Sequence, residues 1–380
     1  MKMKVKNLIV WAWLLGIVLA ERLANDLNEE VLIIEKRVHI WWNCYDYYDK
    51  NWILVHKYWP HIFHTNYEDV WKYINKFTEF NNYQHKVLWF IDWKLAPIPF
   101  NLESLYTLIS KEYAKEIEKS LLKHYTYNSR VSINELRKKA KETWDKNLEF
   151  IANYIFEKIF KNYTIKQWWI KPEEINPEVL KRVPILISKD PRYFQDKFQW
   201  MPKKWYTEMM KKMLESKNIK IMLNTDFKDI KGKIEYERLI FTWPIDEYFE
   251  YKYWKLDYKK TLYKLESYDK INFQSVATIN YPNDYEFTRI TEFKHFYPES
   301  PTFNINKTII CKEIPWVWEI EAYPVETEEN LKILEKYKQE SEKLKNVYFV
   351  WRLANYKYFN MDQTVKNALD FYNSNLKQWN

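Results

Sequence analysis

The sequence predicts an α/β fold with a nucleotide-binding unit at the start of the chain. Three observations support this prediction. A short apolar run ends at Val10 and is followed by a turn and a helix-like stretch from Ile17 to Leu27. A second apolar run, Val31-Leu32-Ile33-Ile34, leads to the acidic Glu35. Further along the chain, helix-like segments and strand-like segments both occur, so the fold is mixed.

The turn after the first strand has the spacing of a dinucleotide-binding fingerprint. Trp11-Ala12-Trp13-Leu14-Leu15-Gly16 would read G-x-G-x-x-G if Trp11 and Trp13 were glycines. Glu35 stands 24 positions after Trp11, where the ribose-binding carboxylate of that motif belongs. Glycine allows the backbone to turn tightly and touch a pyrophosphate. Indoles at these positions would fill the space of the phosphates, so we expect this chain to bind the dinucleotide poorly.

The same replacement recurs along the chain. The sequence has 2 glycines and 20 tryptophans in 380 residues, whereas ordinary usage gives about 27 glycines in this length. Further tryptophans occupy expected turns and helix starts: Trp41, Trp42, Trp59, Trp93, Trp169, Trp205, Trp243 and Trp351.

Lysine outnumbers arginine 51 to 9, as in proteins from AT-rich genomes. Some bacterial lineages read the codon UGA as glycine, and another common alternative code reads it as tryptophan. We therefore hypothesise that this sequence is a translation under the wrong code, with Trp71, Trp144 and Trp168 as candidates for genuine tryptophans. The competing hypothesis is a real protein with a degenerate or engineered cofactor loop.

Composition narrows the functional classes. The net charge of +8 is modest and spread over many lysines, which does not favour a nucleic-acid binder with a concentrated basic stripe. Cys44 and Cys311 indicate no disulfide framework and fit a reducing compartment. His39, His56, His61 and His64 have spacings that match no compact zinc pattern, so no metal is expected.

The amino terminus allows two interpretations. A basic stretch from Met1 to Asn7 precedes a 13-residue apolar run from Leu8 to Ala20, as in a signal peptide. The run is short for a membrane span, which needs about 20 residues. A strand, turn and helix explain the same residues and also account for Glu35. We therefore expect a cytoplasmic protein that does not span the membrane.

The remaining elements follow from periodicity. A hairpin is expected from Val87–Ile91 and Lys94–Ile98, with Asp92-Trp93 as an Asp-Gly-like turn. Residues 37–66 and 161–206 look irregular. Helices are expected as a set of amphipathic segments within 102–160, and at 209–216, 328–344 and 362–372. Strands are expected at 219–223, within 234–325 and at 347–350, the last joining the sheet of residues 5–10.

Ordered segments over some 350 residues resemble the UDP-galactopyranose mutase family. The matching segments are Glu35-Lys36-Arg37 with His39-Ile40-Trp41-Trp42-Asn43, His61-Ile62-Phe63-His64-Thr65-Asn66, Gln167-Trp168-Trp169, Asp190 with Arg192-Tyr193-Phe194, Phe241-Thr242-Trp243-Pro244-Ile245-Asp246, Thr288-Arg289 with Glu292, Tyr323-Pro324-Val325, and Trp351-Arg352-Leu353 with Tyr356, Tyr358 and Met361-Asp362. Almost all departures from the family pattern are tryptophan for glycine.

The resemblance implies a Rossmann-like FAD-binding domain, an inserted α-helical bundle and an antiparallel β-sheet substrate domain. The FAD-binding domain would comprise residues 1–84, 200–242 and 344–380. The sheet domain would comprise residues 85–100, 166–199 with a mobile substrate loop, and 243–343. The helical bundle would comprise residues 101–165. The active site is expected in the cleft between these parts.

The resemblance also implies the chemistry. The family binds FAD, which is active when reduced, and interconverts UDP-galactopyranose and UDP-galactofuranose. Flavin N5 attacks the anomeric carbon of UDP-galactose, so no protein side chain is expected as nucleophile. The expected partners are UDP-galactose, a reductant such as NAD(P)H and a second copy in a homodimer.

Residue roles are carried over by position in the resemblance. Arg182 and Arg289 resemble the arginines that hold the diphosphate, with Tyr163, Trp168, Tyr193, Tyr323 and Tyr358 around the substrate. His61 and His64 resemble the loop beside the flavin, and they and Arg289 would support catalysis. The expected cofactor-binding residues are Trp11, Trp13, Gly16, Glu35, Lys36, Trp42, Asn43, His61, Trp351, Arg352, Met361 and Asp362.

Two other functions stay open from the sequence. One is a flavin amine-oxidase-like oxidoreductase, which shares the nucleotide domain but lacks the paired arginines and the Gln167-Trp168 loop. The other is a non-catalytic carbohydrate-binding protein that stacks sugars on genuine tryptophans. The second requires tryptophans on one exposed sheet face.

Overall fold

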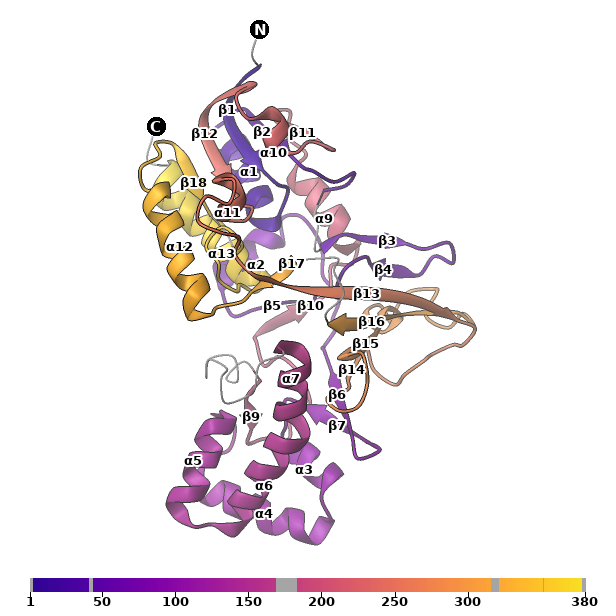
Figure 1. Ribbon diagram of the computed structural model, residues 1–380. Coiled ribbons are helices and arrows are strands. Elements are labelled where there is room, and N and C mark those ends of the chain that lie inside the picture. Colours follow the sequence, from indigo (N-terminus) through magenta and orange to yellow (C-terminus); the bar gives the residue numbers. More distant parts are fainter. Residues whose placement is uncertain (1–2, 41–43, 169–182, 316–320, 351, 378–380) are drawn as a thin grey trace.

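A parallel sheet forms the upper part of the molecule in the computed structural model, which describes residues 3–40, 44–168, 183–315, 321–350 and 352–377 (Figure 1). Its strand order is β11-β2-β1-β12-β18. The strands are β1 (Met3–Val10), β2 (Val31–Ile34), β11 (Ile219–Met222), β12 (Ile234–Phe241) and β18 (Val347–Phe349), and all paired neighbours run parallel. The strand β2 and the last three residues of β1 and β12 are buried apolar runs, because both faces of a parallel sheet are covered there.

Helices cover this sheet. The helix α1 (Leu14–Asp26) is buried over most of its length and packs against α13 (Met361–Phe371) and α9 (Trp205–Met213). The remaining helices of this part are α2 (Glu68–Ile74), α10 (Phe227–Ile230), α11 (Ile245–Tyr248) and α12 (Glu328–Ser341). The predicted strand-helix-strand start and the predicted strand at 347–350 are confirmed. The latter strand joins the sheet through β12 rather than directly beside β1.

A second, mostly antiparallel sheet crosses the middle of the molecule (Figure 1). Its strand order is β17-β13-β16-β15-β14-β6-β7. Its strands are β6 (Val87–Ile91), β7 (Lys94–Ile98), β13 (Tyr258–Tyr268), β14 (Thr278–Asn280), β15 (Arg289–Glu292), β16 (Thr308–Pro315) and β17 (Glu321–Pro324). The pair β14–β6 is parallel, and the other described pairs are antiparallel.

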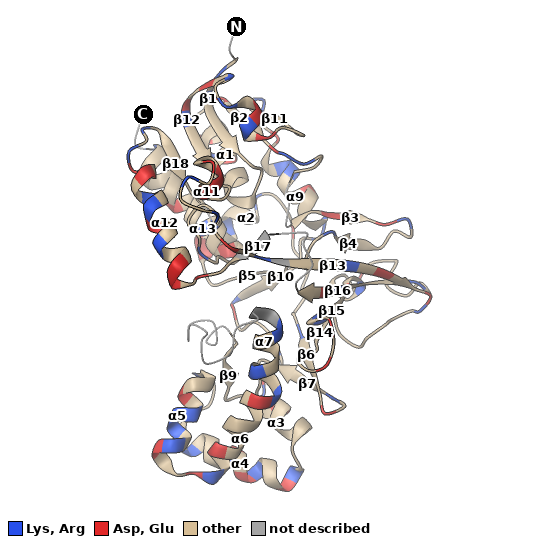
Figure 2. Ribbon diagram, viewed as in Figure 1, with Lys and Arg blue, Asp and Glu red and all other residues tan. Residues whose placement is uncertain are grey.

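A helical bundle packs against the hairpin β6–β7. It comprises α3 (Leu102–Leu108), α4 (Lys111–His124), α5 (Ile133–Thr143), α6 (Lys146–Ile155), the π-helix η2 (Phe156–Lys161) and α7 (Asn162–Trp168). Its apolar stripes form one core with the hairpin. Lysines and glutamates are distributed along the bundle helices (Figure 2), and many of them are exposed. The predicted amphipathic helices within 102–160 are confirmed.

The sequence missed several elements. Within 37–66 the structure has β3 (Asp46–Tyr48), β4 (Leu54–His56) and β5 (Phe63–Thr65), and within 161–206 it has α7, β9 (Ile185–Leu186) and β10 (Phe198–Trp200). These strands are two or three residues long, so each gives too little periodicity to detect. Helix α9 begins at Trp205, four residues before the predicted start.

Several tryptophans have the backbone conformation of glycine. Of the described tryptophans, Trp11, Trp52, Trp93, Trp144, Trp205 and Trp254 have positive φ angles between 54° and 91°. The hairpin β6–β7 has the predicted bounds, and both turn residues, Asp92 and Trp93, have positive φ, as a type I′ Asp-Gly turn requires. Trp144 is the left-handed C-cap of α5, a position that favours glycine, rather than a site for a genuine tryptophan. Trp42 and Trp351 lie outside the described residues.

Candidate active site

A cavity of about 910 Å³ lies where the three parts of the molecule meet. Its wall comes from the start of α1, the segment 59–67, the strands β14 and β15, the bundle helices and the segment 358–364. This volume falls in the range of ligand sites, about 300–1,000 Å³. The cavity therefore occupies the predicted position between the parallel sheet, the antiparallel sheet and the bundle.

Many of the predicted site residues converge on this cavity. Those lining it are Trp13, His61, His64, Tyr163, Tyr193, Arg289, Arg352, Tyr358, Met361 and Asp362. These residues are separated by up to some 350 positions in the sequence, and the fold brings them to one cavity wall.

Arg289 is held by two partners from different elements. It lies at the start of β15, and its Nη2 donates a hydrogen bond of 2.9 Å to the Tyr163 hydroxyl of α7. Its Nε lies 3.3 Å from Oε2 of Glu313 on the neighbouring strand β16. Burial raises the pKa of Glu313, and the nearby guanidinium opposes that rise. These contacts fix a cationic fork at the cavity wall, a geometry suited to a phosphate group.

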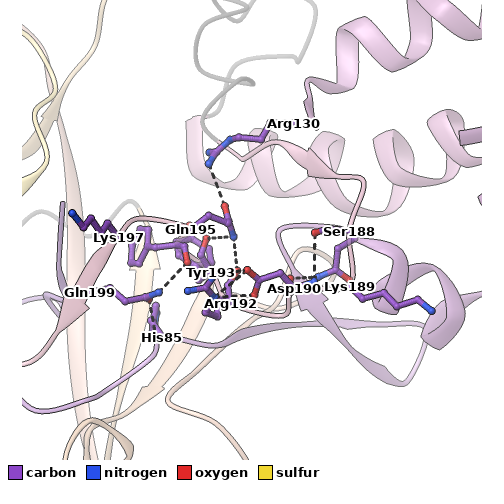
Figure 3. A network of polar contacts seen from close by, with 12 residues as sticks. His85, Arg130, Ser188, Lys189, Asp190, Arg192, Tyr193, Gln195, Lys197 and Gln199 are labelled. Carbon is purple, nitrogen blue, oxygen red and sulfur yellow. Dashed lines mark hydrogen bonds and ion pairs between the residues drawn. The ribbon is translucent and has the colours of Figure 1, made fainter. Parts of the chain in front are cut away.

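Tyr193 is fixed by a polar network in the segment 188–199 (Figure 3). Its backbone N–H donates to the carbonyl of His85 at 2.8 Å, and the His85 N–H in turn donates to Oε1 of Gln199 at 3.3 Å. Arg130 from β8 (Arg130–Val131) donates to Oε1 of Gln195 at 3.2 Å. Burial raises the pKa of Tyr193 to about 12, so its hydroxyl remains a neutral hydrogen-bonding group.

The two histidines of the segment 61–66 have different environments. His64 lies on β5, with Nδ1 2.7 Å from Oδ2 of Asp196. His61 is buried, and burial lowers its pKa well below the usual range, so the ring is neutral. Its Nδ1 has no hydrogen-bond partner among the described residues, which leaves a polar atom for a ligand at the cavity wall.

The end of β1, where a nucleotide would lie, is filled by side chains. Trp11 has a φ of 80° and is 3% exposed, and its ring stacks on Trp243 with a centroid distance of 4.0 Å. The guanidinium of Arg37 lies over both rings, at 5.4 Å and 5.9 Å from their centroids. None of these three residues lines the cavity.

Glu35 is fully buried and is linked to this cluster through Arg37, whose Nη1 lies 3.6 Å from its Oε1. Its Oε2 accepts a hydrogen bond of 3.3 Å from the Ala12 N–H, and its Oε1 accepts one of 3.0 Å from the Arg37 N–H. Burial raises its pKa to about 7, against the lowering effect of Arg37. The predicted ribose-binding carboxylate is therefore covered, although it lies at the expected end of β2.

Arg352 is enclosed by rings in a similar way. Its guanidinium lies 5.8 Å from the ring centroid of Trp13, 5.7 Å from that of Trp59 and 6.0 Å from that of Tyr358. Trp13 is the residue before α1, so its indole lies at the helix N-terminus, where a phosphate group would bind.

The third glycine of the fingerprint is required by packing. A Cβ atom on Gly16 would come within 2.8 Å of the Trp11 carbonyl oxygen and 3.0 Å of Cγ2 of Ile9. This is the close helix–strand approach that the third glycine of the motif allows.

Other predicted residues lie elsewhere. Lys36 is half exposed and pairs with Asp226 at 3.0 Å, away from the cavity. Trp42, Asn43, Arg182 and Trp351 lie outside the described residues, and the side chains of Trp168 and Tyr323 do as well. The sequence missed Thr278 and Asn280, which line the cavity from β14. Their i, i+2 spacing places both on one face of the strand and is the signal that would have found them.

Among the described residues, no three His, Cys, Asp or Glu side chains gather to hold a metal ion. The described helices include none with the length and apolar character to span a bilayer.

The fit to a bound dinucleotide differs between the two ends of the site. Oδ1 of Asn280, Nδ1 of His61 and Oδ1 of Asp362 line or adjoin the cavity as buried polar atoms without partners among the described residues. This end suits a polar ligand. At the other end, Trp11, Trp243 and Trp13 occupy the fingerprint region, so the residues present do not fit a complete dinucleotide.

Comparison with known proteins agrees with this architecture. Residues 158–358, more than half of the chain, match the family described as UDP-galactopyranose mutase, and residues 13–77 match an NAD(P)-binding Rossmann-like domain. The chain is 34% identical to a probable UDP-galactopyranose mutase of Klebsiella pneumoniae, covering 96% of this chain and 93% of the relative. It is 30% identical to a dTDP-fucopyranose mutase of Escherichia coli, covering 96% and 97%.

The structure is similar to that of a reduced UDP-galactopyranose mutase, with a TM-score of 0.66 and 15% identity over 98% of this chain and 94% of the other. A putrescine oxidase has the same fold, with a TM-score of 0.56 and 9% identity over 99% of each chain. From the family match and the relatives of 30% identity or more over nearly the whole chain, this chain belongs to the UDP-galactopyranose mutase family.

Proposed function

We propose that the protein encoded with glycine at the fingerprint positions interconverts UDP-galactopyranose and UDP-galactofuranose. The observation that carries this proposal is the convergence of ten predicted site residues on one cavity, with Arg289 fixed between Tyr163 and Glu313. The resemblance implies that FAD, when bound and reduced, supplies the nucleophile through N5. The protein side chains then have the tasks of binding and orienting the nucleotide sugar.

In this proposal Arg289 holds the diphosphate of UDP-galactose. The hydrogen bond to Tyr163 and the ion pair with Glu313 leave little rotational freedom to the guanidinium, so less entropy is lost when phosphate binds. Tyr193 and Tyr358 supply hydroxyl groups around the sugar and diphosphate. The neutral His61 ring offers Nδ1 to a polar group inside the cavity.

An amine-oxidase-like reaction is the alternative enzyme function, because such oxidases have the same fold. The carbohydrate-binding alternative loses its structural basis among the described tryptophans. The most exposed indoles are those of Trp52, Trp93, Trp144 and Trp254. They lie in turns or at a helix end in separate parts of the molecule, rather than on one sheet face.

The test uses the chain loaded with FAD and carrying glycine at the fingerprint positions 11 and 13 and at the other tryptophans of expected turns and helix starts. After reduction with dithionite, we expect conversion of UDP-galactofuranose to UDP-galactopyranose, and no conversion before reduction. A flavin-containing protein without this activity would favour the oxidoreductase. NAD(P)H in place of dithionite tests the proposed reductant, and sedimentation tests the proposed homodimer.

Arg289→Ala should weaken UDP binding by about 2 kcal/mol or more, roughly 30-fold in Kd, while flavin content stays unchanged. Arg137→Ala is the matched control, since this arginine lies on α5 and packs on Phe156, remote from the cavity wall. Unchanged UDP affinity in Arg289→Ala would remove Arg289 from its proposed role.

A further inference from the structure

Four indoles form two pairs, one at the end of β1 and one on the cavity wall. They belong to Trp11, Trp13, Trp59 and Trp243, here called the indole plug. Trp11 and Trp243 form the end near Glu35, and Trp13 and Trp59 form the end that lines the cavity. Each pair packs with one arginine, Arg37 or Arg352.

The Trp11 end has a backbone that does not suit tryptophan. A residue with a Cβ atom in the left-handed region costs about 1–2 kcal/mol, and Trp11 has a φ of 80°. The surrounding structure imposes this angle, because the Trp11 N–H donates to the Ile34 carbonyl at 2.8 Å and its carbonyl lies against Gly16. The β1–α1 connection therefore keeps a glycine geometry although its residue is tryptophan.

The Trp11 and Trp243 rings also lie against the charged side chain of Arg37. They stack at 4.0 Å with the Arg37 guanidinium over both rings, and Arg37 Nη1 lies 3.6 Å from Oε1 of the fully buried Glu35. An apolar pair of rings beside a cation and its buried acid does not resemble a hydrophobic core. It places aromatic surface where a polar ligand would otherwise meet both charges.

The cavity end shows the same arrangement. Arg352 is 5% exposed and lies between the rings of Trp13 and Trp59, and Trp59 also lies 5.2 Å from the ring of His61. Both indoles line the cavity wall, so removing them enlarges the cavity toward the N-terminus of α1.

We propose that the indole plug closes the dinucleotide groove of this chain, and that glycine at positions 11, 13, 59 and 243 opens it to a flavin dinucleotide. This inference rests on the proposed function for the identity of the ligand. The opened groove would expose Glu35 to a ribose and the N-terminus of α1 to a pyrophosphate, and it would free Arg37 and Arg352 from the rings.

The experiment compares flavin content in three proteins after incubation with FAD and gel filtration. The groove variant carries Trp11→Gly, Trp13→Gly, Trp59→Gly and Trp243→Gly. The matched surface variant carries the same change at four positive-φ positions with exposed indoles, at 52, 93, 144 and 254. The third protein is the parent chain. Bound flavin is measured by the absorbance of FAD released on denaturation.

We expect close to one FAD per chain in the groove variant and background levels in the parent and surface variants. A near-stoichiometric flavin content in the parent would overturn the proposal, as would an equal gain in the surface variant. If the groove variant does not fold by circular dichroism, the combined eightfold variant replaces it, because the surface changes relieve backbone strain. A folded eightfold variant without bound FAD would also overturn the proposal.

The outcomes separate this inference from the proposed function. A groove variant that binds FAD supports the plug whether or not it has mutase activity, because it keeps tryptophan at the other expected glycine positions. The mutase proposal is contradicted only if the chain with glycine at all these positions binds FAD and lacks mutase activity after reduction. The flavin assay does not depend on turnover, so an inactive protein still gives a clear result.

Discussion

Trp144 offers a sharp test of the inference that tryptophans replace glycines. It is the left-handed C-cap of α5, with a φ of 54°, and its side chain is 90% exposed. A non-glycine residue in this conformation costs about 1–2 kcal/mol. Glycine loses about 0.5–1 kcal/mol more backbone entropy on folding. Almost no buried surface is lost with the indole, so Trp144→Gly should stabilise the chain by about 0.5–1 kcal/mol.

Trp71 provides the opposite expectation for the same substitution. It lies inside α2, its ring stacks on Phe198 with a centroid distance of 4.9 Å, and it packs at a tilt against Trp200 with a centroid distance of 4.5 Å. Loss of these contacts and the low helix propensity of glycine should destabilise Trp71→Gly by about 3 kcal/mol.

The assay is urea unfolding followed by circular dichroism, with the midpoint compared at an unchanged m-value. Trp144→Ala is the control, since it removes the indole and keeps the strained backbone. It should leave stability nearly unchanged. A destabilised Trp144→Gly, or an alanine variant that gains as much as the glycine variant, would refute the reasoning.

Three further predictions concern the nucleotide end of the molecule and its gene. Burial raises the pKa of Glu35 from 4.5 to about 7. Between these two pH values the folded state keeps a proton that the unfolded state has released, so the free energy of unfolding should fall as the pH rises from 4.5 to 7. Glu35→Gln should remove this loss. Measured by urea midpoints from pH 5 to 8, the stability advantage of this variant over the parent chain should grow to the order of 3 kcal/mol and then level off. A constant difference in stability across this pH range would contradict the assignment. Gly16→Ala should destabilise the fold by about 1–3 kcal/mol because its Cβ meets the Trp11 carbonyl at 2.8 Å, and an unchanged thermal midpoint would show that the strand and helix separate easily. The messenger RNA should carry UGA codons at positions 11, 52, 93, 144, 205 and 254 and a UGG codon at position 71. UGG codons at the six positions expected to be UGA would rule out the decoding hypothesis.

Much of the architecture was predictable because it depends on local periodicity. The apolar runs of β1 and β2, the 3.6-residue pattern of the bundle helices and the Asp92-Trp93 turn each lie within a short window of sequence. The short strands β3 and β4 pair with each other but were not predictable, because three residues give too little periodicity. The strand β5 was not predictable because its pairing partner lies in a distant segment. For β5, the partner is β10, more than 130 positions away.

The candidate site was predictable in its members but not in its contacts. The resemblance supplied Arg289, Tyr163 and Tyr193, but the pairing of Arg289 with Glu313 depends on the register between β15 and β16. Thr278 and Asn280 share one strand face through their i, i+2 spacing, but only the tertiary structure places that face against the cavity.

The sequence by itself determined the anomaly, since the tryptophans and the fingerprint spacing are visible without coordinates. Only the tertiary structure decided which indoles have a glycine backbone and which pack normally. The reason is that a φ angle is imposed by the hydrogen bonds and neighbours around a residue, as at Trp11, and not by the identity of its side chain. The tertiary structure also decided that Trp11 and Trp243, 232 positions apart, stack on each other beside the Arg37 guanidinium, because the strands that precede them, β1 and β12, are adjacent in one sheet.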